Sequence, residues 1–455
     1  MRFSAAGDDL NLYKTGLQND LLGRAELGRT LSRIIESVED SLVIALDGRW
    51  GTGKSHFLKR WVGAHSHENG GRAETVYFDA FENDYVSDPL VALVSVVSTR
   101  IPDVGNQKLE KVKQFAIRLL KPATRIGLAL MTAGATSALN EVADAGAEAI
   151  RDETKDAIDA FWKKEAGRQT AMEEFRRAIH DLTLPDDGDG TVRPLVIVID
   201  ELDRCRPDFA LDVLEVIKHF FSVPHVHFIL GVNLDALASS VRVRYGGDID
   251  ATAYLQKFIS FSVSLPEYVG DLQERKAITT HAQHLGNKVK VPESFLDEVV
   301  KQIDVISSGH NISMRDVEKV VSLAALLPEE ATSDNILLGW RVATITLLIM
   351  KVIRPDLERI LREASLEGSE LLEALGIPSD SVSETLEDGR RNSKFNRKGF
   401  VVYSCWKYIC RDGVSDGSDS WVSIARCFNE FGDMHNPRKI PTTIEYDWLS
   451  KYRVS

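Results

Sequence analysis

A glycine-rich octapeptide near the N-terminus, GRWGTGKS at residues 48–55, decides much of how this chain can fold. It matches the pattern G-x-x-x-x-G-K-[S/T], and it lies between an apolar run at 42–46 and a helical pattern at 55–64. In that context the glycines let successive backbone N–H groups turn toward phosphate oxygens, and the helix adds the positive end of its dipole. The octapeptide therefore predicts a phosphate-binding loop that joins a strand to a helix in an α/β fold.

The polar residues of this loop have predicted roles toward a nucleoside triphosphate. Lys54 is expected to reach the β- and γ-phosphates, and Ser55 is expected to offer its hydroxyl to Mg²⁺. We predict that the nucleotide is lined by the whole loop and the residue after it, namely Gly48, Arg49, Trp50, Gly51, Thr52, Gly53, Lys54, Ser55 and His56. ATP with Mg²⁺ is the predicted pair of ligands, and the residues leave the choice between ATP and GTP open.

A second apolar run, at 195–199, ends in the two carboxylates Asp200 and Glu201. A buried strand with this ending is the Walker B pattern when a phosphate loop is also present. Asp200 is predicted to hold the Mg²⁺ shell, and Glu201 is predicted to act as the general base that polarises the attacking water. A carboxylate directly after the metal-associated one favours a hydrolase over a small-molecule kinase.

The rest of the chain alternates between strand and helix before it becomes helical. Further strands are predicted at 75–78, 227–232 and 258–265, with helices at 90–100, 211–221 and 234–242. Continuous apolar strands between helices indicate a parallel sheet that helices cover on both faces. We predict an NTPase domain at 1–266 with a helical insertion at about 103–184, a helical lid-like region at 267–330, and a mainly α-helical C-terminal domain at 331–455.

Composition and charge limit the environment of the protein. The net charge of −13 argues against a surface that grips nucleic acid as a whole, so a nucleic-acid partner is unsupported. The apolar stretches at 126–139 and 343–353 are shorter than the ~20 residues of a membrane span, so a membrane role is not expected. Four cysteines without metal-ligand spacing and a polar N-terminus without a secretory signal favour the cytoplasm.

The histidines do not indicate a metal site. His225 and His227 are two apart on a predicted strand, but no third ligand is near in the sequence, and a polar strand start is expected. His65 and His67 are expected in a solvated loop. Two softer positions concern the nucleotide. Asn233, at the end of a strand, is placed to present its amide to the γ-phosphate or the water, and Arg315, in the run NISMRDVEK, is a candidate to reach the phosphates from the helical region.

Together these blocks resemble the KAP family of P-loop NTPases, which is related to the AAA+ and STAND groups. The likeness rests on Trp50 and on the segments 20–35, 77–93, 198–207, 231–237 and 253–266, with SMRDVEK at 313–319 as a weaker extension. The resemblance implies that residues from Asp20 to Arg24 line the adenine side of the site. It also implies that Asn233 and Arg315 act as sensors, the latter from the helical region after the sheet.

The chain departs from the family pattern at three places. The usual Asp-Asp of the Walker B strand is Asp200-Glu201 here, which keeps a usable base. The F-N-A-W block is FDAF at 78–81, so roles of its asparagine and tryptophan do not transfer. Many members carry transmembrane hairpins inside the insertion, whereas the small-residue stretch at 126–139 predicts a soluble variant whose insertion docks on a partner. Bacterial members imply a context of anti-phage defence.

Several functions remain open at this point. The main hypothesis is Mg²⁺-dependent ATP hydrolysis that drives a conformational or assembly switch, with protein partners or with further copies of the chain. If copies of the chain associate with one another, an arginine of a neighbouring copy would complete the site, and the candidates are Arg204, Arg206, Arg242 and Arg244. The alternatives are a nucleotide-gated scaffold with little turnover, a DNA-translocating motor and a small-molecule phosphotransferase.

Overall fold

The computed structural model contains two compact units, each of which is described by itself. The α/β unit comprises Asp9–Asn19 and Arg24–Leu265, and the helical unit comprises Met1–Asp8, Asp20–Gly23 and Pro266–Ser455. The structure describes residues 11–18, 20–86, 88–101, 107–119, 155–185, 191–269, 275–383, 392, 396–414, 421–428 and 436–452, with side chains from residue 169 onward in the helix that begins at 155.

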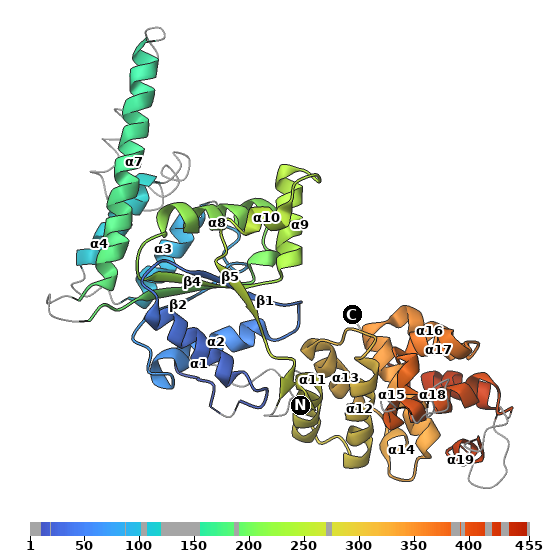
Figure 1. Ribbon diagram of the computed structural model, residues 1–455. Helices are drawn as coiled ribbons and strands as arrows, with labels where there is room; N and C mark the ends of the chain where they lie inside the picture. The colour runs from blue at the N-terminus through green and yellow to red at the C-terminus, as the bar shows by residue number, and fades with distance from the viewer. Residues whose placement is uncertain are drawn as a thin grey trace. The chain divides into compact units, whose positions relative to one another are not determined.

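A five-stranded parallel sheet forms the centre of the α/β unit (Figure 1). Its order is β2-β3-β4-β1-β5, so that β4 separates the phosphate-loop strand from the strand that carries Asp200. This confirms the predicted fold class. The strands are β1 (Val43–Asp47), β2 (Glu74–Asp79), β3 (Leu195–Asp200), β4 (Val226–Val232) and β5 (Phe261–Ser264).

Helices cover both faces of this sheet, which explains why β1 to β4 read as unbroken apolar runs. Alternate residues of a strand point to opposite faces, so Ile44 packs with α1 and α2, whereas Ala45 packs with α3, α8 and α9. The covering helices are α1 (Ala25–Ser37), α2 (Lys54–His67), α3 (Pro89–Arg100), α8 (Pro207–Phe220), α9 (Leu234–Tyr245) and α10 (Ala251–Leu255).

Among the described residues between β2 and β3, α4 (Gln107–Leu119) and α7 (Lys155–Thr183) follow α3 and lie side by side (Figure 1). Val112 of α4 and Phe175 of α7 are fully buried in the same core cluster, where Phe175 meets Phe221 edge to face. The small-residue stretch at 126–139 lies outside the described residues. In the part of the chain that is described, no helix has the length and apolar character needed to cross a membrane.

The helical unit begins with a short antiparallel pair, β6 (Tyr268–Val269) and β7 (Arg275–Lys276), which the helical pattern after Pro266 did not predict. The apolar stretch at 343–353 belongs to α15, whose central residues are buried in the core of this unit. The helices are α11 (Ala277–Lys288), α12 (Glu293–Ile306), α13 (Met314–Ala324), α14 (Glu329–Thr332), α15 (Leu338–Ile353), α16 (Pro355–Arg362), α17 (Gly368–Leu375), α18 (Arg397–Cys410), α19 (Trp421–Arg426) and α20 (Ile440–Ile444).

Candidate nucleotide-binding site

The glycine-rich loop lies between β1 and α2, at the carboxyl edge of the sheet. The N–H of Gly48 donates to the carbonyl of Val232 at 3.2 Å, which fixes the start of the loop to the end of β4. Gly51 and Gly53 have φ angles of 83° and 89°, a left-handed backbone that other residues adopt only with strain. Gly53 also caps the 14-residue helix α2, so the N–H groups at the helix start face the mouth of the loop.

Lys54 curls back over this loop. Its Nζ donates to the carbonyl of Gly48 and, at 3.2 Å, to the carbonyl of Arg49, and the residue is only 8% exposed. Burial lowers the pKa of the Lys54 ammonium, while the nearby carboxylates of Asp203 and Asp200 raise it. The ammonium therefore lies within the loop and can exchange backbone carbonyls for phosphate oxygens.

Asp200 ends β3 and is almost fully buried, with 1% of its surface exposed. Its Oδ1 accepts the N–H of Glu201 at 3.0 Å, its Oδ2 accepts the hydroxyl of Tyr77 at 2.7 Å, and the side chain of Ser55 also hydrogen-bonds to it. Burial raises the pKa of Asp200, and the hydrogen bonds from Tyr77 and Ser55 lower it. The structure thus brings together the two residues predicted to bind the metal.

The donor set of this pair fits Mg²⁺, which prefers hard oxygen ligands and needs only one or two from the protein when phosphate oxygens and water supply the others. Within the described ranges, no cluster of three or more His, Cys, Asp or Glu side chains could hold a metal ion. A cation at this edge would therefore depend on Ser55, Asp200 and the nucleotide.

Glu201 has a left-handed backbone, with φ of 59°, which is strained for a residue with a side chain. Its N–H donates to the carbonyl of Gly231 at 3.1 Å, which holds the strained residue against β4. Its carboxylate is paired with the Nη2 atom of Arg204 at 3.2 Å. Burial raises the pKa of Glu201, and Arg204 lowers it. The predicted general base is thus next to Asp200 but is held by an arginine of its own turn.

Asn233 has a local structural role in addition to its predicted one. Its Oδ1 accepts the N–H groups of Asp235 at 3.1 Å and Ala236 at 3.4 Å, which makes it the N-cap of α9. The cap places Asn233 directly after β4, beside the start of the phosphate loop. Its role toward the γ-phosphate stays a prediction.

The residues predicted for the adenine side are divided between the two units. Arg24 is 4% exposed and donates to the carbonyls of Thr52 at 2.8 Å and Gly53 at 3.3 Å, so it braces the phosphate loop from the start of α1. Asp20 belongs to the helical unit, where its Oδ1 accepts the N–H of Leu22 at 3.1 Å. Arg315 also belongs to that unit, in the first turn of α13.

Sequence reasoning missed two contacts beside the site. Tyr77, two residues before Asp79 on β2, points to the α2 face of the sheet, and its hydroxyl donates to Asp200. The sequence signal that could have shown this direction is the alternation of side chains between the two faces of a strand. Trp50 donates from Nε1 to Asp203 Oδ2 at 2.6 Å, although half of its surface is exposed. This contact links the phosphate loop to the turn that also carries Arg204.

A protein-family model, described as the KAP family P-loop domain, matches residues 24–326. That match covers two thirds of the 455 residues and includes every loop and strand end described above. The chain belongs to the KAP family.

The match extends beyond the α/β unit of this KAP protein and ends just after α13. Among solved structures, the Aeropyrum pernix ORC2 protein, determined in ADPNP–ADP complexes, aligns at 14% identity and a TM-score of 0.36 over 80% of this chain and 75% of that one. No curated protein matches the sequence.

Four arginines were considered as candidates to complete the nucleotide site of a neighbouring copy, and three of them form ion pairs within the KAP chain itself. Arg204 is paired with Glu201, Arg206 binds Asp84 through Nε at 2.6 Å, and Arg244 binds Asp212 through Nη1 at 2.7 Å. The fourth candidate, Arg242, is exposed on α9.

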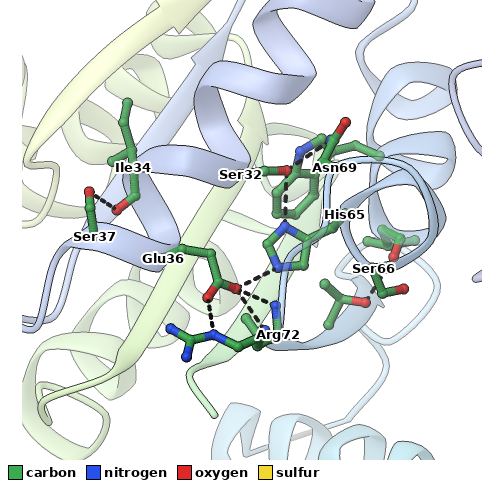
Figure 2. A network of polar contacts seen from close by, with 12 residues as sticks. Ser32, Ile34, Glu36, Ser37, His65, Ser66, Asn69 and Arg72 are labelled. Carbon is green, nitrogen blue, oxygen red and sulfur yellow. Dashed lines mark hydrogen bonds and ion pairs between the residues drawn. The ribbon is translucent and has the colours of Figure 1, made fainter. Parts of the chain in front are cut away.

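The expectation that His65 is solvated is wrong. His65 lies in the last turns of α2 and is fully buried, with Nδ1 3.0 Å from Ser32 Oγ and Nε2 3.2 Å from Glu36 Oε1 (Figure 2). Glu36 also accepts the backbone N–H groups of Arg72 and Ala73. The network ties α1 and α2 to the turn before β2. The prediction was wrong because α2 continues to His67, beyond the predicted end at residue 64, and carries His65 into the core.

Proposed function

We propose that this KAP protein is a Mg²⁺-dependent ATPase in which water attacks the γ-phosphate in line with the leaving group. The observation that carries the proposal is the meeting of Ser55 with Asp200 at the mouth of a phosphate loop that holds Lys54. Glu201, the next residue after Asp200, supplies a carboxylate at the same edge of the sheet. These four residues come from the end of β3, the residue directly after it and the start of α2, all at the same edge of the sheet.

Each group has a defined task in this reaction. Lys54 and the loop N–H groups stabilise the charge that develops on the transferred phosphoryl group, because Lys54 is buried and the start of the loop is already fixed to the end of β4. When bound, Mg²⁺ supplies charge neutralisation at the β- and γ-phosphate oxygens. Glu201 takes up a proton from the attacking water, which requires its carboxylate to leave Arg204. Release of this ion pair is therefore a step that precedes chemistry.

The same ion pair supports a second candidate, a nucleotide-gated scaffold with little turnover. Glu201 and Arg204 belong to one turn and are only partly exposed, so the resting state of the unit holds the base away from a water. Such a protein would bind ATP, change its conformation or assembly, and turn over slowly until another molecule displaces Arg204.

The wider setting is proposed from the family resemblance. The nucleotide cycle would drive a conformational or assembly switch in a bacterial anti-phage defence system, together with protein partners or further copies of the chain. Residues 267–330 would act as a lid that carries Arg315, and Asn233 and Arg315 would sense the γ-phosphate. The four cysteines are all free thiols, which supports a cytoplasmic location.

A nucleotide-trapping experiment tests the hydrolysis. Glu201→Gln is expected to bind ATP as tightly as the wild type and to retain it as ATP, with turnover reduced about 100-fold or more because the general base is lost. The bound nucleotide is identified by chromatography after free nucleotide is removed. Glu26→Gln, which changes an exposed carboxylate of α1, is the matched control and should behave as the wild type.

Two results would change the proposal. ADP on Glu201→Gln, formed at the wild-type rate, would remove Glu201 from the mechanism. Wild-type protein that binds ATP and leaves it intact would favour the gated scaffold.

A further inference from the structure

A tyrosine on the neighbouring strand contacts the carboxylate predicted to bind the metal. Tyr77 lies on β2, where it pairs with Val198, and Asp79 pairs with Asp200. Because residues two apart on a strand share a face, Tyr77 points to the α2 side, as Asp200 does. From there its hydroxyl reaches Asp200 Oδ2 at 2.7 Å.

Both the backbone and the ring of Tyr77 are held by neighbouring residues. Its backbone N–H donates to the hydroxyl of Tyr13 at 2.9 Å, the Nζ atom of Lys59 lies 5.3 Å from the ring centroid, and the residue is only 8% exposed. These contacts restrict the ring before any ligand arrives. The hydroxyl is therefore a fixed donor to Asp200.

The other oxygen of Asp200 is confined as well. Its Oδ1 accepts the N–H of Glu201 at 3.0 Å, and Gly231 lies directly across from it on β4. A Cβ atom at position 231 would stand 2.4 Å from that oxygen, so only glycine leaves room for the carboxylate in this orientation. Tyr77 on one side and Gly231 on the other thus define how the carboxylate faces Ser55.

We propose that Tyr77 is a positioning residue for the metal site, which holds the Asp200 carboxylate in the orientation that binds the cation of the metal–nucleotide complex. This inference rests on the proposed nucleotide and Mg²⁺ site, and it adds a residue that touches neither ligand. Removal of a group that orients a ligating carboxylate through a hydrogen bond typically lowers metal affinity about 10- to 100-fold.

The test is the substitution Tyr77→Phe in the full chain, which removes the hydroxyl and keeps the ring. Mn²⁺ serves as the paramagnetic probe for the metal, and its affinity is measured by electron paramagnetic resonance with a non-hydrolysable ATP analogue present. We expect the Mn²⁺ dissociation constant to rise about 10-fold or more. The affinity for the analogue in EDTA, which excludes the metal, should stay within about twofold of the wild type, because the loop and Lys54 are unchanged.

Tyr254→Phe is the matched control, because it removes a hydroxyl that bonds to a neighbouring tyrosine, Tyr245, on the other side of the sheet. It should leave both affinities unchanged. The proposal is overturned if Tyr77→Phe binds Mn²⁺ within twofold of the wild type. It is also overturned if the variant loses analogue affinity equally in EDTA, because Tyr77 would then support the fold in general.

The experiment also separates this inference from the proposed function. Wild-type protein that binds Mn²⁺ with the analogue but hydrolyses no ATP would refute the proposed ATPase and leave the role of Tyr77 intact. Wild-type protein that binds no metal–nucleotide complex would refute both.

Discussion

Replacing His227 by leucine should remove a buried imidazole that makes the protein sensitive to acid. His227 lies on β4 with no exposed surface, and within the described part of the chain neither ring nitrogen has a hydrogen-bond partner. The pKa of His227 is lowered from 6.5 to about 4, chiefly by burial; His225 adds to the decrease, and Glu36 opposes it. The folded protein therefore excludes a proton that the unfolded chain accepts.

The sign and size of the effect follow from this difference. Above pH 6.5 both states carry a neutral imidazole and stability is unaffected. As the pH falls from 6.5 to about 4, only the unfolded chain takes up the proton, and the free energy of unfolding falls by about 1.4 kcal/mol per pH unit. The loss from this single group is about 2 kcal/mol at pH 5 and about 3 kcal/mol at pH 4.

Thermal unfolding of the wild type and His227→Leu at pH 7.5 and pH 5.0 measures this loss. For a unit of this size, a loss of about 2 kcal/mol in the free energy of unfolding lowers the midpoint temperature of unfolding by roughly 4–8 °C. Between pH 7.5 and pH 5.0, the midpoint of the wild type should therefore fall by that much more than the midpoint of His227→Leu. His67→Leu, at the exposed end of α2, is the control and should keep the wild-type response. Equal shifts in the wild type and in His227→Leu would refute the reasoning.

Two further substitutions test the geometry of the nucleotide site. Gly53→Ala should weaken ATP binding, measured by calorimetry, at least about 10-fold, because φ of Gly53 is 89° and the new Cβ would lie 2.8 Å from Arg24 Nη1. Gly247→Ala, which has open space around the new Cβ, is the control and should bind ATP normally. Normal ATP binding by Gly53→Ala would contradict the loop geometry. Arg204→Met should raise the rate of phosphate release about 3- to 5-fold at saturating ATP, because the partly exposed ion pair with Glu201 is worth up to about 1 kcal/mol. Arg206→Met, which breaks the pair with Asp84, is the control and should leave the rate unchanged. An unchanged rate in Arg204→Met would mean that Arg204 does not restrain Glu201.

The sequence was sufficient for the parts of the fold that depend on local pattern. The loop at 48–55 and the carboxylates after 195–199 each require a strand and a turn in one short segment, and both segments end at the carboxyl edge of the parallel sheet. The limits of β1 to β4 are also local, because a strand that is buried on both faces must be apolar throughout. The strand predicted at 258–265 is shorter in the structure, where β5 covers only Phe261–Ser264 and is largely exposed.

The contacts that orient the site could not be predicted in the same way. Tyr77 and Asp200 are 123 residues apart, and only the pairing of β2 with β3 brings them together. His65 reads as a polar residue near a glycine-containing turn, and its burial depends on Ser32 and Glu36 of a different helix. The residues of Asn233-Leu-Asp equally fit a helix cap and a phosphate sensor, so the pattern alone does not separate them.

The most direct test of the central claim is the release of inorganic phosphate from ATP by purified wild-type protein and by Lys54→Ala, side by side with Mg²⁺. Lys54 is the side chain that the loop buries and the one predicted to reach the phosphates, and it belongs to α2 and not to a strand of the sheet. The account predicts repeated turnover by the wild type and a rate at least about 100-fold lower in Lys54→Ala. Equal rates in the two proteins, or no turnover in the wild type, would contradict it.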